Sequence, residues 1–198
     1  MQELKVKVKD EAEAAEVAKA WAEIENCIGQ LTIADIDKEV DPGQFYTVVP
    51  HDGSEVFHLD VSKAHRLVKA NHAAFYQTKV PLTDDLVSGV LSEGGIETDE
   101  VDRLPSDFKW DVPALGFYWS KGGNVLGFQL FDGSHRAIKA AQRGDKEIPV
   151  ALCSLEFAKE QLKFRFKNEN INKVMGLVAK HNFEFRGPLR EAKEKGLL

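Results

Sequence analysis

A short segment of the sequence combines residue types that can bind an anion. Residues 132–136 read Asp-Gly-Ser-His-Arg and follow an apolar run that ends at Phe131. Asp-Gly is a frequent turn pair, and apolar residues recur at helical spacing after it, so the pattern predicts a helix that begins at Ser134. The first turn of a helix presents unpaired backbone N–H groups at the positive end of its dipole. With the guanidinium of Arg136 and the ring of His135, these groups predict a phosphate or carboxylate site.

The elements on both sides of this segment are expected to hold it in place. Residues 125–131 predict a buried strand, residues 134–143 a helix that ends at Gly144, and residues 148–152 a second buried strand. Residues 112–119 are expected to pair with the first of these strands in a hairpin. The sequence therefore predicts a mixed α/β (α+β) fold.

The rest of the chain predicts short elements of both kinds. Ser62 is expected to cap the helix that follows it, and the apolar face of the first helix could pack on the domain or pair with a second copy of the chain. Residues 35–43 are polar and rich in turn formers, as in a linker. The other expected helices are 10–30, 63–74, 83–91, 98–104, 155–166, 170–181 and 188–198, and the other expected strands are 1–9, 44–49, 55–59 and 183–185.

Composition narrows the function classes. The chain has 198 residues, of which 43% are hydrophobic and 29% charged, as in a globular protein with a buried core. The formal net charge of −6 argues against a broad nucleic-acid surface, although local basic patches stay open. The sequence contains no apolar leader and no membrane-spanning run, so a cytoplasmic protein without a membrane partner is expected. Its two cysteines, Cys27 and Cys153, indicate no disulfide framework.

The segment from Phe131 to Val150 resembles the signature of the superfamily that joins sulfiredoxin to the N-terminal domain of the partition protein ParB, and that includes ADP-dependent free-serine kinases. The shared parts are a hydrophobic strand, a Gly-x-[His/Arg]-Arg turn, an Ala-rich helix that ends in a glycine, and an Ile-Pro strand. The resemblance implies a ParB/sulfiredoxin-like domain over residues 44–154, with a small mixed sheet flanked by helices. Residues 1–43 would be an N-terminal helical extension, and residues 155–198 a C-terminal helical segment packed on the domain.

The resemblance also implies a set of site residues. In this family, the turn and the helix start bind nucleotide phosphates, which implies phosphate-binding roles for Gly133, Ser134, His135 and Arg136. His135 is also a candidate catalytic residue, because its ring can donate, accept or titrate. For His135, capping or packing is the alternative interpretation.

Two carboxylates are candidates for catalysis and for a divalent metal. Asp132 adjoins the predicted anion site, although an Asp-Gly pair is also ordinary turn chemistry. Glu169 belongs to a Glu-Asn pair that lies roughly 20 residues after the Ile-Pro strand, as a similar pair does in ParB proteins. A solvated helix start is the favoured interpretation of this second motif.

Two further sets of residues have metal-binding chemistry. Four histidines recur every seven residues, but metal pairs on a helix need a spacing of three or four, so coincidence is favoured. An acidic cluster is expected to form a solvated face more often than a cation site. The histidines are His51, His58, His65 and His72, and the acidic residues are Glu93, Glu97, Asp99, Glu100 and Asp102.

The function expected from the residues and the resemblance is phosphate chemistry on a nucleotide. A nucleotide-dependent phosphotransferase or hydrolase would use ATP, ADP or CTP with Mg²⁺, and a small molecule could accept the phosphoryl group. Peroxiredoxin repair is not expected, because Ser134 stands where sulfiredoxin needs a cysteine thiolate. The alternatives are a nucleotide-switched DNA-partition or DNA-binding module, a ParB-like nuclease, and a family member with structural duties only.

Overall fold

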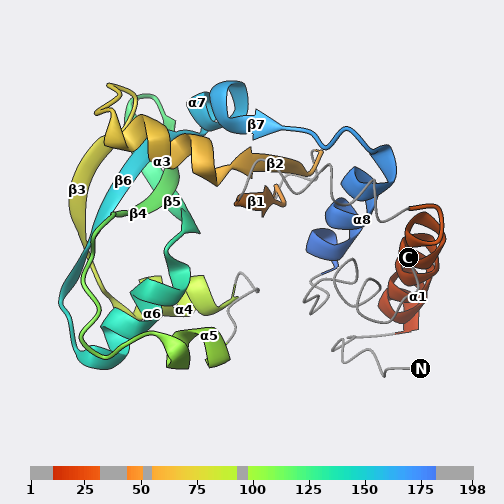
Figure 1. Cartoon of the computed structure of the whole chain (residues 1–198), viewed down its shortest axis with the longest axis horizontal. Coiled ribbons are helices and arrows are strands. Elements are labelled where there is room, and N and C mark those ends of the chain that lie inside the picture. Colours follow the sequence, from red (N-terminus) through yellow and green to blue (C-terminus); the bar gives the residue numbers. More distant parts are fainter. Residues whose placement is uncertain (1–10, 32–43, 51–54, 93–97, 182–198) are drawn as a thin grey trace. The chain divides into compact units, whose positions relative to one another are not determined.

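The computed structural model describes residues 11–31, 44–50, 55–92 and 98–181 (Figure 1). The chain divides into two compact units, one made of residues 1–58 and 164–198 and the other of residues 59–163. This division differs from the expected boundaries after residues 43 and 154. The predicted elements at 1–9, 35–43, 183–185 and 188–198, together with His51, Glu93 and Glu97, lie outside the described residues. None of the described helices is both long and apolar enough to cross a membrane.

The unit of residues 59–163 is built on a four-stranded mixed sheet with the strand order β3-β6-β4-β5. β4 pairs antiparallel with β5 and parallel with β6, and β6 pairs antiparallel with β3. The mixed α/β class is thus confirmed. The strands are β3 (Tyr76–Pro81), β4 (Ala114–Lys121), β5 (Asn124–Asp132) and β6 (Glu147–Ser154), and the helices are α3 (Val61–Lys69), α4 (Asp84–Ser92), α5 (Thr98–Arg103), α6 (Ser134–Arg143) and α7 (Leu155–Phe157).

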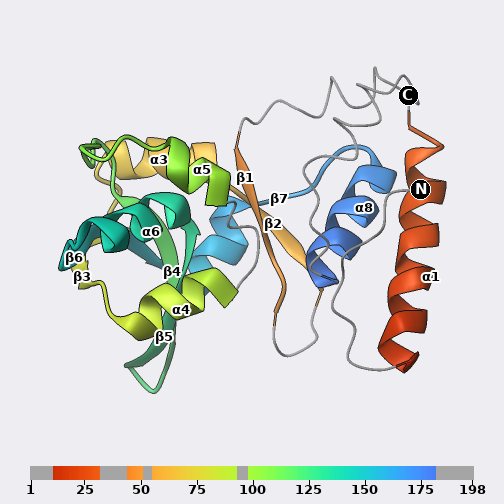
Figure 2. The same cartoon turned by 90° about the horizontal axis from the view of Figure 1, so that it is seen from below.

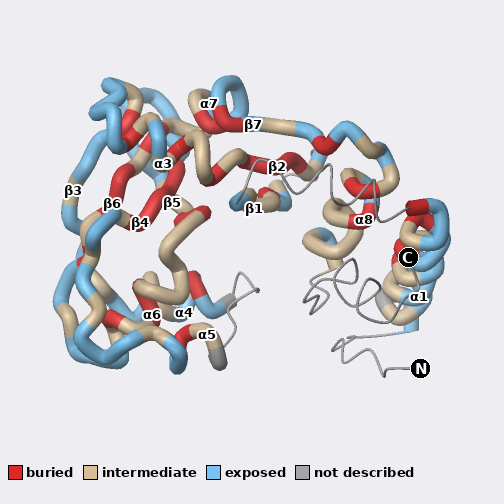
Figure 3. Tube along the Cα trace, in the orientation of Figure 1, coloured by how far each residue is buried: buried red, intermediate tan, exposed pale blue. Residues whose placement is uncertain are grey.

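Burial of one face of α6 explains why this unit folds as it does. Ala137, Ile138 and Ala140 are buried on α6 and pack with buried residues of the sheet, such as Leu130 and Val150. Helices α4 and α5 flank α6, and each adds a buried valine to the same core (Figures 1 and 2). Figure 3 shows buried positions along β4, β5 and β6, and four of the buried residues of these strands belong to this core: Ala114, Leu130, Ile148 and Val150. The sheet and α6 are therefore held in a fixed relation, which sets the position of the segment between β5 and α6.

The other unit packs α1 (Glu11–Ile28) against α8 (Glu169–Lys180). Its main core joins Ala20, Ile24 and Cys27 of α1 to Val174 of α8, so the apolar face of α1 is used within the chain. The strands β1 (Phe45–Val48), β2 (Phe57–Asp60) and β7 (Lys163–Phe164) form a small sheet in the order β1-β2-β7.

Two predictions of local structure were wrong, and one strand was missed. The helix after residue 62 begins at Val61, because Asp60 rather than Ser62 accepts the capping bond, from the Lys63 N–H at 2.6 Å. The predicted helix 155–166 is instead the short α7, a π-helical turn over Ala158–Leu162 and the strand β7. Strand β3 was missed, because most of its residues are exposed and its sequence lacks an apolar alternation.

Candidate functional site

The predicted anion-binding segment lies where β5 ends and α6 begins. Gly133 is the N-cap of α6, adopts a left-handed conformation with φ of 86°, and has no side chain of its own with which to cap the helix. The first backbone hydrogen bond of the helix runs from Ala137 N to Gly133 O, at 2.9 Å. A Cβ atom added to Gly133 would lie 2.8 Å from the Cβ of Ala114 and 3.1 Å from Nη2 of Arg136. Glycine is required here both by its φ and by the close approach of β4 and Arg136.

Asp132 is the centre of a three-residue polar cluster. Its Oδ2 atom accepts a hydrogen bond from Nε2 of His65 at 2.9 Å and another from Nη2 of Arg136 at 3.0 Å. The three side chains come from α3, β5 and α6, all within the unit of residues 59–163. The exposed fractions are 13% for Asp132, 20% for Arg136 and 28% for His65, so the imidazole is the most accessible member.

The surroundings of Asp132 favour its ionised form. Burial alone would raise the pKa of this carboxyl group, but the hydrogen bond from His65, the charge of Arg136 and the Gly133 backbone hydrogen bond outweigh burial and hold the pKa below its usual value. Asp132 is therefore a carboxylate near neutral pH and can only accept hydrogen bonds. It follows that Nε2 of His65 carries the proton of that bond.

Arg136 also holds the segment that precedes β4. Its Nη1 donates to the carbonyl oxygen of Val112 at 2.8 Å, and its guanidinium lies 4.9 Å from the ring centroid of Trp110. Together with the bond to Asp132, these contacts use two of the five N–H donors of the guanidinium. The Nε1 of Trp110 is buried and has no hydrogen-bond partner within the described part of the chain.

A second arginine on α6 binds the same segment. Arg143 donates to the carbonyl oxygens of Ser106, at 3.2 Å, and Phe108, at 2.9 Å, and its guanidinium lies 4.6 Å from the Phe108 ring centroid. The carboxylate of Asp145 forms an ion pair with the same guanidinium, with 2.5 Å between Oδ2 of Asp145 and Nη2 of Arg143. The two arginines thus fasten residues 106–112 along α6, and the role of Arg136 is partly structural.

The other predicted phosphate-binding residues are also at this helix start. Ser134 and His135 occupy the first turn of α6 and are half-buried. The structure thus places all the residues from Asp132 to Arg136 at one strand–helix junction.

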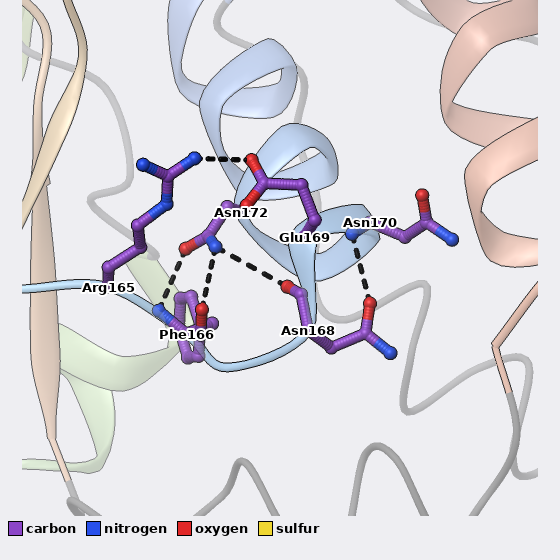
Figure 4. A network of polar contacts seen from close by, with 6 residues as sticks. All are labelled: Arg165, Phe166, Asn168, Glu169, Asn170 and Asn172. Atoms are coloured by element: carbon purple, nitrogen blue, oxygen red, sulfur yellow. Dashed lines mark hydrogen bonds and ion pairs between the residues drawn. The ribbon is translucent and has the colours of Figure 1, made fainter.

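Glu169, the second candidate carboxylate, lies in the other unit, at the start of α8 (Figure 4). Its Oε1 accepts a hydrogen bond from Nη2 of Arg165 at 2.6 Å, and this bond is the main cause of a lowered Glu169 pKa. Asn168 caps the helix through the Asn170 N–H at 2.9 Å. Asn172 both donates to Phe166 O and accepts from Phe166 N, each at 2.8 Å. These contacts form a solvated helix start, and Asp132 and Glu169 belong to different units.

The structure brings no set of metal-binding side chains together within the residues that it describes. Among residues 11–31, 44–50, 55–92 and 98–181, no group of three or more His, Cys, Asp or Glu side chains could hold a metal ion. His58 is buried, bonds to Thr47 at 3.0 Å and contacts the rings of Phe45, Phe164 and Phe166. His72 is exposed, and its ring centroid lies 5.5 Å from that of Phe157. His65 binds Asp132, so the described histidines have separate environments.

Comparisons with family models, with curated proteins and with solved structures found no match to this chain.

The partnership of His65 with Asp132 was not predicted from the sequence, because the two residues are 67 positions apart. The local pattern that reveals a helix start contains no information on which distant side chain contacts it. The one available signal was an aspartate directly after the apolar run that ends at Phe131, because a carboxylate beside buried residues needs a partner.

Proposed function

We propose that the start of α6 is a nucleotide-phosphate site of the ParB/sulfiredoxin type and that the protein is a nucleotide-dependent phosphotransferase or hydrolase. The observation that carries this proposal is the meeting of a helix N-terminus with a glycine N-cap, the Arg136 guanidinium and the His65 imidazole at one junction. Backbone N–H groups at such a terminus favour a bound phosphate. The resemblance of residues 131–150 to the family signature supports the same assignment.

Charge at the junction sets what the site can bind. The Asp132 carboxylate is offset by Arg136, to which it is bonded at 3.0 Å, so the carboxylate does not leave an uncompensated negative charge beside the ligand. The positive end of the α6 dipole then favours an anion. Phosphoryl transfer needs mainly positioning and charge neutralisation, which are the properties that this junction offers.

In this proposal Asp132 holds His65 and Arg136 rather than Mg²⁺, because its Oδ2 already accepts a hydrogen bond from each of them. We therefore place Mg²⁺ with the nucleotide, as the counter-ion of its phosphates.

Thermal unfolding with a panel of nucleotides tests the proposal. ATP, ADP or CTP with Mg²⁺, at one hundred times its dissociation constant, should stabilise the protein by about 2.7 kcal/mol, which is on the order of 10 °C for a domain of this size. Absence of a shift with all three nucleotides contradicts the proposal. Binding of duplex DNA with a steep salt dependence would instead favour the DNA-binding alternative. Conversion of circular plasmid to its linear form by the protein would favour the nuclease.

Substitutions at Ser134 separate ligand binding from helix stability. Ser134→Asp places a negative charge in the first turn of α6, which should stabilise the helix by about 0.3–1 kcal/mol and at the same time repel a phosphate. Ser134→Asn is the matched neutral control, since it has nearly the same shape. We expect the aspartate variant to lose the nucleotide-dependent shift and the asparagine variant to keep most of it. Equal shifts in both variants would place the nucleotide elsewhere.

A further inference from the structure

The imidazole of His65 belongs to the β5–α6 junction, although His65 lies outside the Asp-Gly-Ser-His-Arg segment from which the sequence predicted an anion site. It reaches Asp132 from α3, whereas the predicted site residues all lie between β5 and α6. In the described part of the chain, the hydrogen bond to Asp132 is the only one that this ring makes. A neutral imidazole with its proton on Nε2 has an unshared electron pair on Nδ1. Asp132 therefore holds the ring in the form in which Nδ1 is a base.

We propose that His65 is the general base of the phosphate site, with Asp132 as the residue that positions it. This inference rests on the proposed nucleotide function. It adds a catalytic residue from α3 to the binding residues of the β5–α6 junction. A carboxylate that fixes the tautomer and orientation of a histidine is a recurrent arrangement for proton transfer.

The reaction step assigns each proton and electron pair. Nδ1 of His65 accepts a proton from water, or from the hydroxyl group of a phosphate acceptor, as that oxygen forms a bond with the terminal phosphorus. The bond between this phosphorus and the bridging oxygen breaks, and its electron pair leaves with the shortened nucleotide. The imidazolium, stabilised by the Asp132 carboxylate at 2.9 Å, then returns its proton to solvent.

The exposure of the three residues fits these roles. His65 is 28% exposed and can meet a ligand, whereas Asp132 is 13% exposed, with His65 and Arg136 both bonded to its Oδ2. A residue that served only to tie α3 to the end of β5 would not need this accessibility. Removal of a general base typically lowers turnover by about 10²–10⁴-fold.

Two substitutions distinguish a base from a structural tie. His65→Gln keeps an N–H donor for Asp132 but has no basic nitrogen. His65→Ala leaves room for free imidazole beside Asp132. His72→Ala is the control, because His72 is exposed and its ring contacts Phe157. Phosphate release from the nucleotide that stabilises the wild-type protein is measured for all variants, together with the thermal shift produced by that nucleotide.

The expected result is a separation of turnover from binding. His65→Gln should keep the nucleotide-dependent shift and the KM, with kcat reduced at least about 100-fold. Imidazole in solution should restore part of the activity of His65→Ala, and His72→Ala should behave as the wild type does.

The possible failures are distinguishable. Absence of a thermal shift in the wild-type protein overturns the nucleotide site and with it the role of His65. A shift without phosphate release, or with phosphate release unchanged in His65→Gln, overturns the role of His65 alone. Loss of binding and turnover in parallel in His65→Gln, or failure of imidazole to restore His65→Ala, would make His65 a structural residue.

Discussion

Replacement of Gly133 by alanine tests whether the β5–α6 junction is as tightly built as the structure indicates. The left-handed φ of 86° is unfavourable for any residue with a Cβ, by about 1–2 kcal/mol. The added Cβ would also lie 2.8 Å from the Cβ and 3.0 Å from the Cα of Ala114, which is backbone that cannot move aside easily. Overpacking of this kind costs typically about 1–3 kcal/mol. The two contributions together predict a loss of about 2–5 kcal/mol in the free energy of unfolding.

Gly144 provides a matched control at the other end of the same helix. Its φ is also 86°, but nothing lies within 4 Å of the position that a Cβ would occupy. Gly144→Ala should therefore cost only the conformational part, about 1–2 kcal/mol. The difference between the two variants isolates the contact with Ala114 and Arg136 and should amount to about 1–3 kcal/mol.

Urea unfolding followed by tryptophan fluorescence measures this difference. A Trp21→Phe background restricts the signal to Trp110 and Trp119, which both belong to the unit of residues 59–163. With a slope of about 1–2 kcal/mol per molar urea, a difference of ~2 kcal/mol separates the two midpoints by about 1–2 M. Equal midpoints for the two variants would refute the tight approach of β4 to the start of α6.

The remaining predictions concern ionisation and one side-chain network. Asp132 has a lowered pKa, so its contribution to stability should be present above its ordinary pKa of 3.8 and be lost as the pH falls through the lower folded value. The difference between the urea midpoints at pH 6 and pH 3 should therefore be smaller in Asp132→Asn than in the wild type. Burial raises the pKa of Cys153 from 9.0 to about 12, so in a Cys27→Ala background the thiol should not react with Ellman's reagent at pH 8 until urea unfolds the protein. The stability due to the protonated Cys153 thiol should be complete below about pH 9 and decline as the pH rises toward 12, a trend that Cys153→Ala should lack. Asn172→Ala should lower the free energy of unfolding by about 1–3 kcal/mol, because it leaves the backbone N–H and C=O groups of Phe166 without their partner at 2.8 Å. Unfolding is followed through the fluorescence of Trp21. A loss no larger than that of Asn170→Ala would contradict this role of Asn172.

The elements around the junction could be predicted because their signals are local. Apolar spacing and the terminal glycine predicted a helix over 134–143, and α6 has these bounds with Gly144 in the left-handed conformation that ends helices. Glycine-rich turn residues predicted the β4–β5 hairpin, and the turn between the two strands contains Gly122 and Gly123, both with positive φ. The predicted helix 170–181 is α8, which begins one residue earlier at Glu169, after the capping residue Asn168.

Elements that depend on their surroundings could not be predicted. The stretch from Leu155 to Phe166 has helical spacing, but Phe164 and Phe166 pack with Phe45 in an aromatic cluster of the other unit, which requires the chain to leave the helix. β3 is stabilised by its backbone pairing with β6 and shows little pattern of burial. Tertiary contacts decide the structure of both stretches, and local propensity carries no information about them.

The same limit applies to the contacts of Arg136 at the β5–α6 junction. The sequence predicts that Arg136 binds phosphate, and the structure shows that its guanidinium also bonds Asp132 and the carbonyl oxygen of Val112. A guanidinium held at three sides by a carboxylate, a carbonyl and the ring of Trp110 has a fixed direction, and a fixed donor loses less entropy when it binds an anion. The structural and ligand-binding roles of Arg136 are therefore compatible. Their compatibility explains why Ser134, which can be changed without loosening the junction, is the better position for testing the phosphate site.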